Sequence, residues 1–96
     1  MRQAKGDDLE CALQDVNEAL RLKPDNADAF DSRGNIRAAK GDVEGALQDY
    51  NEAIRLKPDY ADAFYNRGIV RRAKGDEEGA QQDYSEAVRL GYKPKN

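Results

Sequence analysis

The feature that most constrains this chain is a repeat with a period of 34 residues. Ala27–Tyr60 aligns without a gap on Ala61–Pro94, and 21 of the 34 positions are identical. Glu10–Asn26 aligns on Glu44–Tyr60 at the same spacing, with 13 of 17 positions identical. Such a period is typical of stacked supersecondary units, none of which buries its apolar face alone. We therefore expect one domain over 1–96, built from a half unit (1–26) and two full units (27–60 and 61–94).

Each full unit is expected to contain two helices joined by a Lys-Gly-Asp turn. In that turn Gly41 or Gly75 can adopt the left-handed conformation that ends a helix, and Asp42 or Asp76 can cap the next one. A Pro-Asp pair follows the second helix, so Asp25 and Asp59 are expected N-caps. The sequence predicts helices over about 9–23, 27–40, 43–57, 61–74 and 77–90, with residues 1–5 a helical stub or disordered.

Composition excludes several classes of function. The chain has 96 residues, a formal net charge of −3, one cysteine and no histidine. A histidine triad, a zinc site with the usual ligands and a disulfide framework are therefore excluded, and no phosphate-binding loop is present. We expect no catalysis, no cofactor and no metal. Neither a signal peptide nor a membrane span is recognised, which favours a cytoplasmic location.

The spacing of small and aromatic residues resembles the tetratricopeptide repeat family. The matching residues of the first helices are Phe30 with Gly34, and Phe64 with Gly68. Those of the second helices are Ala46, Tyr50, Ala53 and Pro58, then Ala80, Tyr84 and Ala87, and in the half unit Ala12, Ala19 and Pro24, with Val16 at the aromatic position. The resemblance covers essentially the whole chain. It implies an all-α fold, a right-handed superhelical stack of antiparallel helix pairs (an α-solenoid).

The resemblance also implies a function, which is to hold a peptide or a partner helix on the concave face that the first helices line. The residues at the matching positions are Asp28, Asp31, Asn35, Ala38, Tyr60, Asp62, Tyr65, Asn66, Ile69 and Arg72. Some family members grip the C-terminal carboxylate of heat-shock chaperones. Asn35 and Asn66 match their two asparagines, but Asp31 occupies the place of the first lysine, so that activity is not expected. An acidic rim prefers basic or neutral peptides.

Basic residues form a stripe on each first helix where the family pattern has Leu and Tyr. The two stripes are Arg33, Arg37 and Lys40, and Arg67, Arg71 and Lys74. We expect the arginine stems to pack over the helix pairs and the heads to meet the periodic acids Asp15, Asp49 and Asp83. The alternative is a strip that contacts an anion or a nucleic acid, although the acidic overall balance gives no general attraction to nucleic acid.

The N-terminal end suggests that the chain is a segment of a longer repeat protein. Met1–Gly6 matches the end of a first helix, so most of that helix would be missing, and Cys11 stands where other units have a packed glycine. The alternative function is therefore a self-associating structural fragment that forms a homodimer through the helix over 9–23. The expected core comprises Phe30, Tyr50, Ala53, Phe64, Tyr84 and Ala87, with Gly34 and Gly68 at helix contacts.

Overall fold

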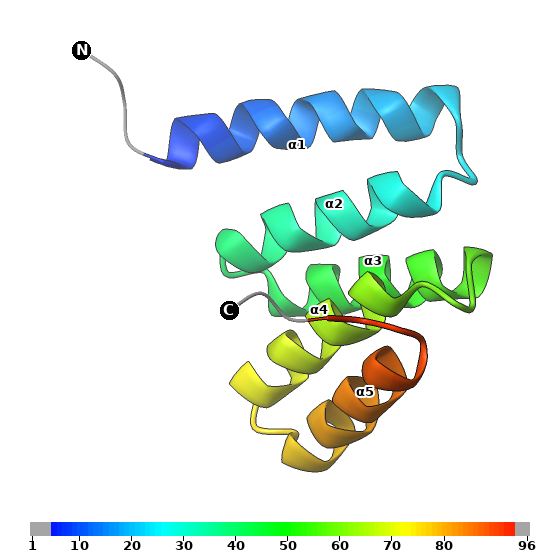
Figure 1. Cartoon of the computed structure of the whole chain (residues 1–96). Coiled ribbons are helices and arrows are strands. Elements are labelled where there is room, and N and C mark those ends of the chain that lie inside the picture. Colours follow the sequence, from blue (N-terminus) through cyan, green and yellow to red (C-terminus); the bar gives the residue numbers. More distant parts are fainter. Residues whose placement is uncertain (1–4, 94–96) are drawn as a thin grey trace.

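Residues 5–93 are described by the computed structural model, and they form five α-helices with no strand among them (Figure 1). The helices are α1 (Lys5–Leu22), α2 (Ala27–Ala39), α3 (Val43–Leu56), α4 (Ala61–Ala73) and α5 (Glu77–Arg89). α2 packs on α3 and α4 packs on α5, while α1 packs on α2 and α3 on α4. The predicted all-α helical solenoid is confirmed. Four of the five predicted helices agree with the observed ones to within one residue at either end.

The Lys-Gly-Asp turns have the predicted geometry. Gly41 and Gly75 have φ angles of 88° and 95°, which an L side chain rarely adopts. The backbone N–H of Gly45 donates to Asp42 Oδ1 at 2.9 Å, and that of Gly79 donates to Asp76 Oδ1 at the same distance. These turns reverse the chain within each pair and bring α3 against α2 and α5 against α4.

The predicted N-caps at Asp25 and Asp59 are wrong by one residue. Each aspartate lies inside a tight turn, which the backbone N–H of the next residue closes by donating to Lys23 O or Lys57 O. The cap therefore falls on the residue after the turn. Asn26 caps α2 by accepting from the backbone N–H of Ala29, and Tyr60 is the N-cap residue of α4 but makes no side-chain cap bond.

The predicted start of the first described helix, at residue 9, is also wrong, because α1 begins at Lys5 and runs through the Lys-Gly-Asp copy at 5–7. This copy is out of register with the repeat, because Asp7 stands one residue before the position equivalent to Asp42, while Cys11 occupies the position of Gly45. The turn of the later units does not form here. The helix continues instead, and Cys11 is exposed rather than packed. Residues 1–4 of the expected N-terminal stub lie outside the described residues.

The core lies between the helix pairs, and three of the six side chains that the sequence predicted for it are buried. Tyr50, Ala53 and Ala87 are buried as expected, and Tyr50 clusters with Ala46 and Val70. Phe30, Phe64 and Tyr84 are only partly buried. The two phenylalanines each lie 5.4 Å from the guanidinium of the arginine three residues later instead of entering the core. Tyr84 corresponds to Tyr50, but no described helix follows α5 to cover it.

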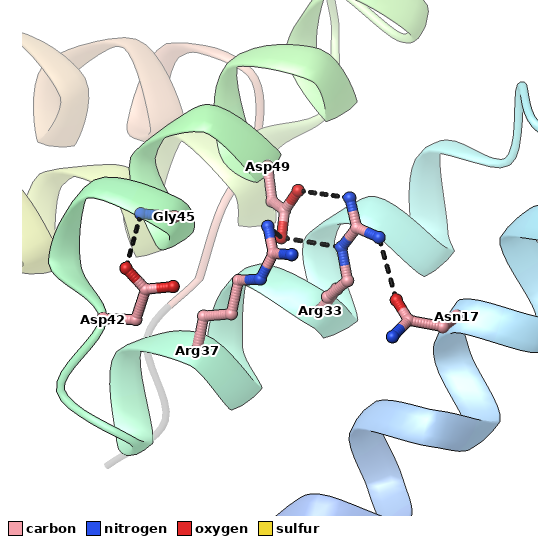
Figure 2. Close-up of polar contacts among 6 residues, drawn as sticks. All are labelled: Asn17, Arg33, Arg37, Asp42, Gly45 and Asp49. Atoms are coloured by element: carbon pink, nitrogen blue, oxygen red, sulfur yellow. Dashed lines mark hydrogen bonds and ion pairs between the residues drawn. The ribbon is translucent and has the colours of Figure 1, made fainter.

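The basic stripe binds the periodic acids, as predicted (Figure 2). Arg33 donates to both carboxylate oxygens of Asp49, at 3.0 and 2.9 Å, and Arg37 donates to Asp49 Oδ2 at 3.0 Å. Asp49 is only 2% exposed. Arg67 and Arg71 bind Asp83 in the same way in the next pair. Asp15, the third periodic acid, is exposed. These four arginines are thus engaged within the scaffold, which removes the main support for the anion or nucleic-acid interpretation.

Polar contacts also join successive helix pairs. Arg33 donates to Asn17 Oδ1 of α1 at 2.9 Å, and Arg67 donates to Asn51 Oδ1 of α3 at 2.8 Å. Lys40 pairs with Glu10, and Lys74 pairs with Glu44. Because the same contacts recur one period later, α1 packs against α2 in the same way as α3 packs against α4. None of the described helices is both long and apolar enough to cross a membrane.

Candidate functional site

A pocket of about 560 Å³ opens where α2, α4 and the segment after α5 meet. Its lining includes five of the ten residues that the sequence predicted, which are Asp31, Asn35, Asp62, Tyr65 and Asn66. Two further lining residues, Tyr92 and Lys93, come from the C-terminal segment. We call this cavity the α2–α4 pocket. Its volume is in the range of protein sites that hold small ligands or side chains.

Asp31 is the most buried carboxylate of the pocket, with 8% of its surface exposed. It accepts hydrogen bonds from Asn66 Nδ2, at 3.1 and 3.4 Å to its two oxygens, and from Tyr60 Oη at 3.5 Å. Burial raises the pKa of Asp31, and the charges of Asp62 and Asp28 add to this effect, while the two hydrogen bonds oppose it. A positive charge brought to the pocket would therefore stabilise the ionised form of Asp31.

Two tyrosines connect the pocket to its surroundings. Tyr50 Oη donates to Asn35 Oδ1 at 2.5 Å, so the buried ring of α3 fixes the amide of Asn35 on α2. Tyr60 lies beside three carboxylates. Burial raises its pKa, as do a hydrogen bond with Asp28 and the negative charges of Asp31 and Asp62. Tyr60 therefore stays protonated and can donate to Asp31.

The C-terminal segment forms one wall of the pocket, and sequence reasoning missed it. Gly91 has a φ of 104°, and the backbone N–H of Tyr92 donates to Ala87 O at 2.8 Å, which turns the chain back across α4 (Figure 1). The Tyr92 ring then stacks on Tyr65, with centroids 4.3 Å apart and planes at 15°. The sequence feature that could have indicated this turn is Gly91-Tyr92, which stands where the preceding unit has Lys57-Pro58.

The other predicted site residues lie around or away from the pocket. Asp28 and Tyr60 adjoin it through their interactions with Asp31. Ala38 packs against the buried cluster between the helix pairs, so it is part of the core. Ile69 is 46% exposed, and Arg72 is exposed with Nε 3.7 Å from Glu77 Oε1. None of these last three residues lines the pocket.

No group of three or more Cys, Asp or Glu side chains within the described part of the chain is arranged to hold a metal ion. The carboxylates of the pocket are instead hydrogen-bonded to an amide and a phenol, or open to solvent. The arrangement is suited to recognition of a ligand by charge, hydrogen bonds and aromatic contact.

Family models decide what kind of repeat this is. A model described as "TPR repeat" matches residues 34–75, and a model described as "Tetratricopeptide repeat" matches residues 61–90. The chain belongs to the tetratricopeptide repeat family. Membership of this family supports a role as a protein-interaction scaffold. No curated protein sequence matches the chain.

Solved structures share the tetratricopeptide repeat fold. A crystal structure of MamA is similar with a TM-score of 0.82 and 24% identity, over 88% of this chain and 49% of that one. The first tetratricopeptide repeat domain of Spaghetti (RPAP3), bound to the HSP90 peptide SRMEEVD, is similar with a TM-score of 0.84 and 24% identity, over 91% and 69%. The chain spans about half the length of the MamA chains that it matches.

Proposed function

We propose that residues 1–96 act as a single domain that binds a short peptide or a partner helix on the face formed by α2 and α4. The observation that supports this proposal is the α2–α4 pocket. Five of the residues expected from the family pattern line this one cavity, and they come from α2 and α4, which begin 34 residues apart in sequence at Ala27 and Ala61. Such a pocket combines hydrogen-bonding groups with the ring of Tyr65, as ligand sites do.

The neighbour bound to the HSP90 peptide supports a peptide ligand, since that protein has a similar fold. The chemistry of this chain argues against the same ligand. Asp31 and Asp62 line its pocket, and the peptide of the neighbour has the acidic sequence SRMEEVD. We therefore expect peptides without a net negative charge to bind here.

Selection from a random peptide library tests the proposed function. Peptides that bind the chain are expected to lose about tenfold or more in affinity for Tyr65→Ala, because Tyr65 presents aromatic surface to the pocket. Val88→Ala is the control, since it truncates an apolar side chain that is 63% exposed on α5 and is not part of the pocket lining. Calorimetry measures both affinities, and circular dichroism checks that both variants fold. Equal affinity for both variants would contradict binding at this face.

A second candidate function is self-association through α1. Among the five helices α1 packs only on α2. Leu9, Leu13 and Val16 are only partly buried, and Leu22 is largely exposed. Exposed apolar helix faces are covered in many repeat proteins by another unit, and a second copy of the chain can supply the cover as a closed two-fold dimer.

The expected result is that the chain sediments as a dimer at concentrations on the order of 100 µM, with Leu13→Glu shifting it towards monomer. The charge on the apolar face of α1 would be buried without a partner in the dimer. Ala73→Glu adds the same charge at an exposed position of α4 and is expected to leave the mass unchanged. A monomer mass for the unmodified chain throughout this range would refute the dimer.

A further inference from the structure

The α2–α4 pocket has an excess of negative charge at its wall. Asp31 and Asp62 line it, and Asp28 lies close enough to both Asp31 and Tyr60 to influence their protonation. Lys93 is the basic residue among its lining side chains. The arginines of the stripe do not offset this charge, because Arg33 and Arg67 are bound to Asp49 and Asp83 on α3 and α5.

The pocket also has an aromatic wall that the repeat pattern does not provide. Tyr65 on α4 contacts Tyr84 at a centroid distance of 5.3 Å and stacks on Tyr92 at 4.3 Å. Tyr92 reaches this position because the chain turns back at Gly91 after α5. The faces of tyrosine rings carry negative partial charge and attract cations, and guanidinium groups also stack on them.

We propose that the α2–α4 pocket binds the side chain of an arginine or lysine in a bound peptide, with Asp31 and Asp62 as countercharges and Tyr92 as one wall. This inference rests on the proposed function, since it names the ligand group that the peptide face recognises. Asp62 is exposed and pairs with the cation at the rim, while hydrogen bonds from Asn66 and Tyr60 hold Asp31 in position. Asn35, fixed by Tyr50, offers its amide N–H groups to the peptide backbone.

Lys93 gives this proposal a distinctive consequence. Lys93 lies on the lining, and it has the same charge as the proposed ligand. The charge of Lys93 partly offsets the negative charge of Asp31 and Asp62, and it repels an incoming arginine or lysine. Removing this charge should strengthen binding, whereas removing a packing residue in the same place would weaken it.

Titration of the isotope-labelled full chain with blocked amino acids, followed by NMR at constant ionic strength, tests the inference. The probes are the N-acetyl amides of arginine, lysine, citrulline and glutamate. Citrulline has nearly the shape of arginine without its charge. We expect saturating shifts at Asp62, Tyr65 and Tyr92 with arginine and lysine, and none with citrulline or glutamate. Equal shifts with citrulline, or no saturation with either cation, would overturn the inference.

Variants refine the test without threatening the fold. Asp62→Asn is expected to weaken binding of the arginine probe about two- to fivefold, since its carboxylate is exposed. Asp59→Asn makes the same charge change at an exposed turn residue outside the pocket lining and is expected to have no effect. Lys93→Ala is expected to strengthen binding about twofold. Weakening by Asp59→Asn as large as that by Asp62→Asn would show that only the net charge matters, and the inference would fail.

The two proposals fail in different ways. If peptides from the library bind through Tyr65 but keep their affinity when every arginine and lysine in them is replaced by citrulline or norleucine, the peptide face stands and the cation site is wrong. If no peptide binds while the arginine probe saturates the pocket, the cation site stands and the proposed peptide function is wrong. If neither the peptides nor the probe binds, both proposals are wrong.

Discussion

Replacing Asp49 with alanine is expected to lower the free energy of unfolding by about 3 kcal/mol. Asp49 is 2% exposed and binds Arg33 through two hydrogen bonds and Arg37 through a third. Its removal leaves two guanidinium groups against the α2–α3 contact without their carboxylate. This loss is near the lower end of the range for removing one partner of a buried ion pair. The side chains of Arg33 and Arg37 are 19% and 27% exposed, so water can solvate part of each.

Urea unfolding followed by circular dichroism measures this loss. Asp15→Ala is the matched control, because Asp15 has the same place in the 34-residue period but is exposed on α1. Its effect is expected to stay within about 0.5 kcal/mol. Since domains of this size have total stabilities of only about 5–15 kcal/mol, the Asp49 variant should be visibly less stable at room temperature. Equal losses for the two variants would mean that the Asp49 contacts contribute nothing beyond an exposed charge.

Replacing Gly34 with leucine is expected to destabilise the chain by about 3 kcal/mol through overpacking. A Cβ at this position would lie 2.6 Å from Tyr50 Cε1, and Tyr50 is 1% exposed, so its ring has no free space into which it can move. Gly68→Leu meets Tyr84 at 2.7 Å in the equivalent contact. Tyr84 is only partly buried and can tilt towards solvent, so we expect a smaller loss of about 1–2 kcal/mol there.

The order of these two losses is the informative result. Both variants remove a helical glycine, which by itself favours the helix, so any loss comes from the contacts of the new side chain. These contacts are with Tyr50 at position 34, and with Tyr84 and the backbone oxygen of Ala80 (3.2 Å) at position 68. Ala73→Leu, at an exposed position of α4, provides the control for adding a leucine to a helix and is expected to change little. Thermal melts of the four proteins suffice for the comparison. A larger loss for Gly68→Leu than for Gly34→Leu would mean that coverage by the following helix does not restrain Tyr50.

Local patterns were sufficient for most of the fold because the signals that set them lie close together in sequence. Gly41 and Asp42 define a turn through the conformational freedom of glycine and a carboxylate that reaches the backbone three residues on. The small residues Gly34 and Gly68 predicted close helix contacts. The structure shows that the contacts are with Tyr50 and Tyr84, because a Cβ at either glycine would overlap the tyrosine ring. The periodic pairing of arginine with Asp49 and Asp83 followed from the repeat, because one satisfied contact implies its copy.

Predictions of burial and of pocket lining depended on which side chains lie against one another in the fold. Phe30 and Tyr50 both looked like core, yet only Tyr50 lies between two helix pairs, while Phe30 packs under a guanidinium. The family pattern brought Asp31 and Asp62 onto one face, but Ala38 belongs to the core and Ile69 lies outside the pocket. Burial is a property of the neighbours of a side chain, and those neighbours come from other units.

By itself the sequence determined the repeat, the helix pairs, the turns and the arginine–aspartate pairing, because each depends on residues at fixed separations within or between copies. Only the tertiary structure decided the course of the chain where the repeat is broken. It showed that α1 runs through the Lys-Gly-Asp copy before Cys11. It also showed that Gly91 turns the chain so that Tyr92 stacks on Tyr65 and closes one side of the pocket. The Lys-Gly-Asp copy at 5–7 is out of register with the repeat by one residue, and the segment after α5 departs from the repeat at Gly91, so periodicity did not predict the course of either segment. Tyr92 is positioned by a contact with Tyr65, a residue far from it in sequence, which only the fold brings beside it.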